Sequence, residues 1–286
     1  MPSHSQQQKR NGLFWTAKLP ELPPLHFFGA LHFGTEQMYP LPQVLEDAYL
    51  ADNAVAFETN LGELSTPQFN AMMTDMGRQS DGTYLSQNLK PDTWKALSAI
   101  SLKLGYSPEY INTLQSWYCA SILTSAALKL AGLNSHLGID GYIFQRSVIE
   151  QKPVICLETP QKQLELLASI NPETDEIFIQ HTVKELADMA KFSHEMLDFW
   201  LEGNAKGLAR LVEDGFENND SLQKLMLEDR NRQWFNKLHN ANTQNLSVLS
   251  VVGAGHLVGP NSILNLFREY GYVVTVGTSC TKNNLQ

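Results

Sequence analysis

Two apolar runs, each ending in a histidine, form the clearest hydrophobic pattern in the chain. Residues 26–31 (His-Phe-Phe-Gly-Ala-Leu) precede His32, and residues 250–255 (Ser-Val-Val-Gly-Ala-Gly) precede His256. In both, a glycine stands three residues before the histidine, which makes each a Gly-x-x-His motif. Short apolar runs of this kind are typical of strands buried on both faces.

The segments after the two motifs also resemble each other. After the first motif, apolar residues at helical spacing predict a helix over residues 42–50, and an apolar run predicts a strand over 54–57. After the second, the same reasoning predicts a helix over 263–267 and a strand over 272–276. With a leading strand over 14–17, the sequence predicts an α/β fold whose mixed central sheet is built from two βαβ units with Gly-x-x-His strand ends.

The long segment between the two units is mainly helical in pattern. We predict a single α/β domain over residues 1–286, in which residues 62–245 form a large, mainly helical insertion. One apolar run, residues 153–157, predicts a strand inside it.

Helix boundaries in the insertion are predicted from periodicity and glycine. Apolar residues spaced by three and four predict one helix over residues 108–131. Residues 181–239 are predicted as nearly continuous helix, with breaks near Gly203, Gly207 and Gly215.

Composition narrows the function classes. A chain of 286 residues with 43% apolar content can build a sizeable core, and a net charge of −9 argues against a nucleic-acid-binding surface. The longest apolar stretch, residues 117–131, is too short and too polar to span a bilayer, so no integral membrane segment is predicted. Residues 1–10 carry no apolar core of a secretory signal, which leaves the compartment open.

Candidate chemistry gathers at the predicted strand ends. Glu58 and Glu158 each come directly after an apolar strand, as His32 and His256 do. The carboxyl ends of parallel strands are where open α/β sheets bind ligands, and the repeat places the two histidines at the ends of neighbouring strands, outside the core. Two imidazoles with one or two carboxylates suit a catalytic divalent metal. The simpler alternative is that each histidine caps a strand and bonds a backbone carbonyl.

Several short motifs, in order between residues 25 and 276, resemble the TraB/GumN family, to which the Tiki metallopeptidases belong. They are Gly-Ala-Leu-His (29–32), Met-Tyr-Pro-Leu-Pro (38–42), Phe-Glu (57–58), Leu-Glu-Thr (157–159), Asp-Arg-Asn (229–231) and Val-Gly-Ala-Gly-His-Leu-Val-Gly-Pro (252–260).

This resemblance implies a fold like that of the erythromycin-esterase and haem-binding relatives of Tiki. It implies a peptidase that depends on a divalent metal, with Mn²⁺ or Co²⁺ favoured and Zn²⁺ compatible. It marks His32, Glu58 and His256 as functional, and we assign them as the metal ligands. The Arg-Asn motif makes Arg230 a candidate to stabilise a developing oxyanion, and Asp140 matches a family aspartate that is also placed to cap a helix.

The expected function is therefore a metal-dependent hydrolase that acts on a peptide or protein. Whether the chain forms a homo-oligomer is left open. Glu158 has three open roles: metal ligand, general base, or partner that holds a histidine tautomer. Two alternatives stay open for the whole protein. One is an ester hydrolase that uses a histidine without metal; the other is a protein that binds haem or a metal without turnover.

Overall fold

The computed structural model describes residues 12–80, 82–170, 172–216 and 219–277. The N-terminal segment in which we found no secretory signal lies outside these residues. The chain divides into two compact units, which we describe separately. The sheet unit comprises the described residues of 1–59, 134–158 and 195–286, and the helical unit those of 60–133 and 159–194. A single domain with an insertion over residues 62–245 stays a prediction.

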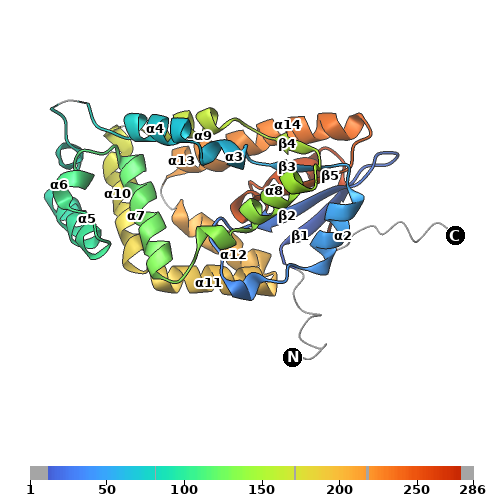
Figure 1. The fold of residues 1–286 in the computed structure, drawn as a ribbon, viewed down its shortest axis with the longest axis horizontal. Helices are drawn as coiled ribbons and strands as arrows, with labels where there is room; N and C mark the ends of the chain where they lie inside the picture. The colour runs from blue at the N-terminus through green and yellow to red at the C-terminus, as the bar shows by residue number, and fades with distance from the viewer. Residues whose placement is uncertain (1–11, 81, 171, 217–218, 278–286) are drawn as a thin grey trace. The chain divides into compact units, whose positions relative to one another are not determined.

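The sheet unit contains a six-stranded mixed sheet, which confirms the predicted fold class at that level (Figure 1). Its order is β4-β3-β5-β2-β1-β6, with β1 antiparallel to both of its neighbours and every other pair parallel. The strands are β1 (Phe14–Lys18), β2 (Leu25–Ala30), β3 (Ala54–Phe57), β4 (Val154–Cys156), β5 (Val248–Gly253) and β6 (Val273–Val276).

The two strands that lead into the motif histidines, β2 and β5, are parallel neighbours, with Gly29 paired to Val252. The two strands of each predicted βαβ unit are not neighbours, because β5 lies between β2 and β3, and β2 and β1 lie between β5 and β6. Since β2, β5, β3 and β4 are mutually parallel, their carboxyl ends lie at one edge of the sheet.

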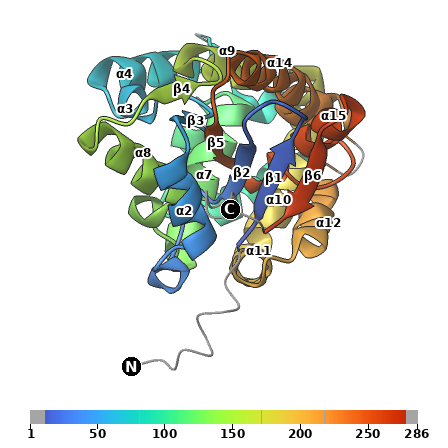
Figure 2. The ribbon, with the colours of Figure 1, turned by 90° about the vertical axis from the view of Figure 1, so that its right-hand side faces the viewer.

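Helices cover both faces of this sheet (Figure 2). Successive side chains of a strand point to opposite faces of the sheet, so Phe27 contacts the helices on one face and Phe28 those on the other. The contacts are Phe27–Phe267 at 5.2 Å on one face, and Phe28–Trp200 at 5.9 Å with Phe57–Phe144 at 5.3 Å on the other. The helices of the unit are η1 (Glu36–Met38), α2 (Gln43–Ala51), η3 (Ser135–Leu137), α8 (Ile139–Ile149), α11 (Met189–Glu202, of which residues 195–202 belong to this unit), α12 (Ala205–Gly215), α13 (Asp220–Gln223), the π-helix η4 (Lys224–Glu228), α14 (Asp229–Thr243), η5 (Ala254–His256) and α15 (Ile263–Glu269).

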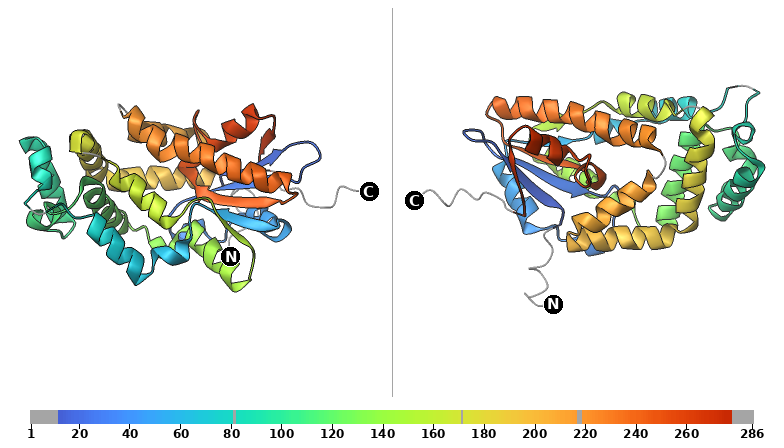
Figure 3. Two further views of the ribbon diagram at one scale, coloured as in Figure 1. Left: turned by 90° about the horizontal axis from the view of Figure 1, so that it is seen from above. Right: turned by 180° about the vertical axis from the view of Figure 1, so that it is seen from behind.

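The helical unit packs α7 against α10, and α10 against α5 (Figure 3). None of the helices in the described part of the chain is long and apolar enough to cross a membrane. The helices of the helical unit are α3 (Leu61–Leu64), α4 (Pro67–Met76), η2 (Leu85–Asn88), α5 (Pro91–Lys103), α6 (Pro108–Ile111), α7 (Ser116–Leu130), α9 (Pro160–Ala168) and α10 (Pro172–Ala187).

The prediction of one helix over residues 108–131 was wrong. It is broken after Ile111 because the next residues bond to a distant segment instead of to the preceding turn. The Gln115 N–H donates to the Gly77 carbonyl at 2.8 Å, and the Thr113 carbonyl accepts from Gln79 N–H at 2.8 Å. Tertiary hydrogen bonds therefore override the local periodicity.

Two of the three predicted glycine breaks are confirmed. Gly203 has a left-handed φ of +67° between α11 and α12, and Gly215 ends α12. Gly207 instead lies inside α12, where a Cβ would stand only 2.7 Å from the Phe199 ring. Glycine at this position allows close packing of two helices. From sequence alone, such a glycine cannot be distinguished from one that ends a helix.

Candidate functional site

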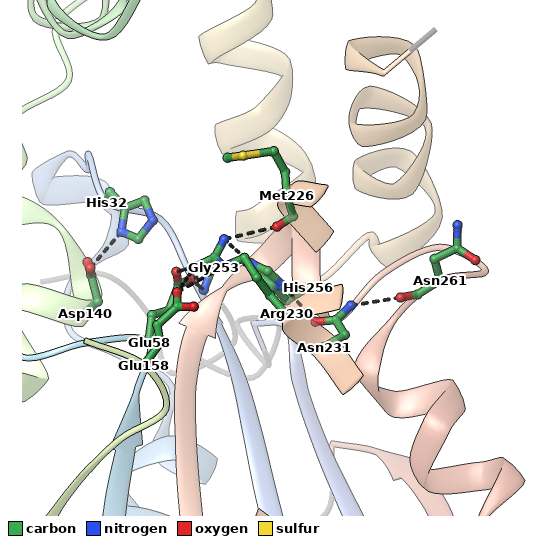
Figure 4. Close-up of polar contacts among 10 residues, drawn as sticks. All are labelled: His32, Glu58, Asp140, Glu158, Met226, Arg230, Asn231, Gly253, His256 and Asn261. Carbon is green, nitrogen blue, oxygen red and sulfur yellow. Dashed lines mark hydrogen bonds and ion pairs between the residues drawn. The ribbon is translucent and has the colours of Figure 1, made fainter. Parts of the chain in front are cut away.

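Four predicted residues come together at the carboxyl edge of the sheet (Figure 4). Glu58 follows β3, and Glu158 lies just past β4. The ladder continues beyond the strands, because Glu158 N–H donates to the Glu58 carbonyl at 2.8 Å, so the two acidic residues are neighbours. His256 and Arg230 complete the group, both in hydrogen-bond contact with its members.

Arg230 is the centre of this group. Its Nη2 donates to Glu58 Oε2 at 2.6 Å and to Glu158 Oε1 at 2.6 Å, and its Nε donates to the same Glu158 oxygen at 3.0 Å. Nη1 donates to the Met226 carbonyl at 3.1 Å and lies 3.1 Å from His256 Nε2. Arg230 is buried; burial lowers its pKa, but the two carboxylates raise it, so the guanidinium stays charged.

The Met226 carbonyl belongs to η4, the π-helix directly before α14. Such widened turns are rare and are concentrated at functional sites. Nothing in the sequence pattern of residues 224–228 signals this turn, so Met226 was not predicted as part of the site.

Asn231 fixes the tautomer of His256. Its Nδ2 donates to the Asn261 carbonyl at 2.8 Å, so its Oδ1 faces His256 Nδ1 at 2.8 Å. An amide oxygen can only accept, which requires a proton on Nδ1 and leaves the Nε2 lone pair toward Arg230. Burial lowers the pKa of His256 to about 3, although Glu58 raises it, and the histidine is neutral at pH 7. The 3.9 Å approach of Nε2 to Glu58 is thus not an ion pair.

The expectation that His256 lies outside the core was wrong. The short turn η5 leaves His256 only 4% exposed, with its ring 4.2 Å from that of Trp234. The Arg230 guanidinium lies 4.7 Å from the centre of the same indole. Trp234, on α14, was missed because an apolar residue on a helix carries no sign of what it will cover.

His32 differs from His256 in exposure and charge. Its side chain is 57% exposed, and its Nδ1 lies 2.7 Å from Asp140 Oδ2. Partial loss of hydration lowers the pKa of His32, but Asp140 and then Glu58 raise it, to about 9 in net effect. His32 therefore carries a proton at pH 7, and its Nδ1–H is held by Asp140 in either charge state.

Asp140 reaches His32 because α8 begins directly against the first motif. A Cβ on Gly138 would stand 2.3 Å from the His32 carbonyl oxygen, so only glycine allows this approach. The N-cap residue of α8 is Gly138. Asp140 lies in the first turn and bonds His32, so the alternative that it caps the helix is not what the structure shows.

Gly253 is where the three predicted metal ligands meet. Its N–H donates to Glu58 Oε1 at 2.7 Å. A Cβ on Gly253 would stand 2.9 Å from Glu58 Oε1 and 3.7 Å from both His32 Nε2 and His256 Cδ2. The missing side chain thus leaves a cradle bordered by Glu58, His32 and His256.

Charge and donor chemistry at this cradle fit a divalent cation. Once His32 has given up its proton, the carboxylates of Glu58, Glu158 and Asp140 oppose one guanidinium and leave two negative charges, which a dication would balance. Burial raises the pKa of Glu58, but Arg230, His256 and His32 lower it to about 2, so this donor is ionised. Among the described residues no three His, Cys, Asp or Glu side chains already stand as a metal shell. His256 Nε2 would have to exchange Arg230 for the metal.

Gly253 gives the first prediction. We expect Gly253→Ala to reduce the predicted metal-dependent hydrolysis at least about 100-fold, because its Cβ would fill the cradle between the predicted ligands. The φ of Gly253 is −50°, which alanine also adopts, so the thermal midpoint should change by no more than about 4 °C.

Gly255→Ala is the matched control, because its Cβ would meet Val212 at an ordinary 3.6 Å. Turnover and thermal unfolding are measured for both variants. Equal turnover of Gly253→Ala and Gly255→Ala would show that the cradle is not used.

The chain is similar to known proteins over most of its length. The chain is similar to the uncharacterized protein YbaP of Escherichia coli (strain K12), with 25% identity over 250 residues, 87% of this chain and 90% of YbaP. It is also similar to the uncharacterized protein YbaP of Shigella flexneri, with 25% identity over 243 residues, 85% and 87% of the two chains. No solved structure gives a significant match. The sequence profile of the TraB/PrgY/gumN family matches residues 13–276, nearly the whole chain, and the protein belongs to that family.

Proposed function

We propose that the protein is a divalent-metal-dependent hydrolase, most similar in chemistry to the Tiki metallopeptidases, and that it cleaves peptides or proteins. The observation that carries this proposal is the convergence of His32, Glu58 and His256 on Gly253. Both imidazoles are held through Nδ1, which directs each Nε2 to act as the ligand. Histidines that bind metals in proteins are commonly oriented in this way.

In this proposal, His32 Nε2, His256 Nε2 and the Glu58 carboxylate hold the metal. A bound Mn²⁺, Co²⁺ or Zn²⁺ would lower the pKa of a water molecule and polarise the scissile carbonyl. Asp140 keeps a proton on His32 Nδ1, and Asn231 keeps one on His256 Nδ1.

Arg230 and Glu158 have separate roles. Arg230, once released from His256, presents Nη1 to the developing oxyanion. Glu158 holds the guanidinium through two hydrogen bonds to one oxygen, so its contacts favour a positioning role over that of a ligand. Of the roles left open for Glu158, this is nearest to that of a partner that orients a site residue. The residue that Glu158 orients is Arg230, not a histidine.

A metal-independent ester hydrolase is the second candidate, and one contact favours it. Arg230 Nη1 lies 3.1 Å from His256 Nε2. This contact occupies the Nε2 lone pair that would otherwise bind the metal. In that case the His32–Asp140 pair would act as general base. Because the pKa of His32 is raised to about 9, such a base would be largely protonated at pH 7.

The pH dependence of metal binding gives the second prediction. A metal must displace the proton on His32, whose pKa is raised from 6.5 to about 9. Mn²⁺ affinity should therefore rise about tenfold per pH unit from pH 6.5 to 8, where a histidine of ordinary pKa would give a plateau near pH 7.

The measurement is a Mn²⁺ competition titration at several pH values in that range. His256 should add no slope there, because its pKa of about 3 keeps it neutral throughout. An affinity that is flat above pH 7 would contradict the charged His32–Asp140 pair.

The function itself is tested with a peptide library and purified protein. Cleavage should require added Mn²⁺ or Co²⁺ after dialysis against EDTA. Ester hydrolysis that persists in EDTA, with no cleavage of peptides, would favour the metal-independent candidate.

A further inference from the structure

The helical unit contains a cleft whose lining residues take no part in the site described above. It has a volume of about 780 Å³ and is formed by α4, the end of α5 with the turn after it, and one face of α7. Ligand sites for small molecules commonly have volumes in this range. The cleft is partly open to solvent.

The floor of the cleft is an apolar stripe along α7. Tyr118, Ile122, Ala126 and Leu130 line it at intervals of four residues, which places them on one side of the helix. The stripe is about 18 Å long at the helical rise per residue. Met73, Leu104 and Tyr106 complete the apolar walls. The shape therefore suits an elongated apolar molecule.

At the start of the stripe, the ring of Tyr118 lies against the end of α4. A Cβ on Gly77 would stand 2.3 Å from Tyr118 Cδ1, so the ring occupies space that only glycine leaves free. Tyr118 is 8% exposed, which leaves its ring fixed.

Two lysines give the cleft a positive charge. Lys103, the last residue of α5, and Lys129, on α7, both line it, and none of the other lining residues is acidic. Neither lysine forms an ion pair with a carboxylate in the part of the chain that the structure describes. In a chain of net charge −9, two unpaired cations beside an apolar stripe indicate an anionic ligand.

We propose that this cleft binds one monomeric long-chain carboxylic acid. The hydrocarbon chain lies along the α7 stripe, where it removes apolar surface from water. The carboxylate accepts hydrogen bonds from the ammonium groups of Lys103 and Lys129. Ser121 and Ser125, which also line the cleft, supply hydroxyl groups beside the stripe.

The test uses dodecanoate, titrated by calorimetry below the concentration at which it forms micelles, with 1-dodecanol as the uncharged probe. Dodecanoate should bind at one per chain, and dodecanol at least about tenfold more weakly. The double variant Lys103→Gln, Lys129→Gln should lose at least about tenfold in dodecanoate affinity and leave dodecanol unchanged. Lys95→Gln, an exposed lysine of α5 outside the cleft, is the control and should bind normally.

Ser125→Trp tests the place of binding. Ser125 is exposed, so the variant should fold with the wild-type circular dichroism while its indole fills the cleft and abolishes binding of both probes. The proposal is overturned by the absence of saturable binding, by several molecules bound per chain, or by Ser125→Trp binding like the wild type. None of these readouts depends on hydrolytic activity.

Discussion

Replacing Arg230 by methionine is expected to cost about 3–5 kcal/mol of the free energy of unfolding and at least about 100-fold in turnover. The stability loss follows from burial, because Glu58 and Glu158 lie side by side and share this one guanidinium. Without it, two neighbouring buried carboxylates lose the cation that they share. The loss should shrink as the pH falls, because Glu58, whose pKa Arg230 helps to lower to about 2, takes up a proton at higher pH in the folded variant than in the folded wild type.

Two further variants separate charge from position. Arg232→Met removes an exposed arginine from the same helix and should change neither quantity. Arg230→Lys keeps the charge but loses the planar fork that reaches both glutamates, so it should fall between the two. Urea unfolding and turnover that are alike in Arg230→Met and Arg232→Met would contradict the central role of Arg230.

The two motif histidines should respond differently to alanine substitution. His32→Ala should lower turnover at least about 1,000-fold and change the free energy of unfolding by about 1 kcal/mol or less, because its side chain is 57% exposed. His256→Ala should lose turnover to the same extent and also about 2–4 kcal/mol of stability. It would leave a cavity beside Trp234 and remove the hydrogen-bond partner of Asn231.

His136→Ala supplies the control for an exposed histidine, since His136 is exposed on the short helix η3. Turnover and urea unfolding are measured for all three variants. A destabilised His32→Ala, or a His256→Ala as stable as the wild type, would contradict the burial difference between the motifs.

The strands and their chemistry were predictable because their signals are local. Apolar runs located β2, β3, β4 and β5, and the residues after them located Glu58, Glu158, His32 and His256. Parallel strands end at one edge, so the four residues could be expected there without knowledge of the order of strands. That order depends on long-range pairing, and the sequence did not reveal that β5 lies between β2 and β3.

The connections inside the site were less predictable. Arg230 and Asp140 were singled out by the family resemblance, but their partners depend on how α14 and α8 pack on the sheet. The carbonyl of Met226 and the ring of Trp234 have no sequence signal at all. The break in the helix over 108–131 has the same origin, because hydrogen bonds to residues 77–79 compete with the local pattern.

The most direct test of the proposed metal site is Mn²⁺ binding to EDTA-dialysed protein. The electron paramagnetic resonance signal of the free ion measures binding, and peptide cleavage is measured in the same samples. We expect one bound Mn²⁺ per chain and cleavage that rises with occupancy, with both lost in His32→Ala and in Glu58→Gln. Cleavage at the full rate in protein that binds no Mn²⁺ would contradict the proposed metal site.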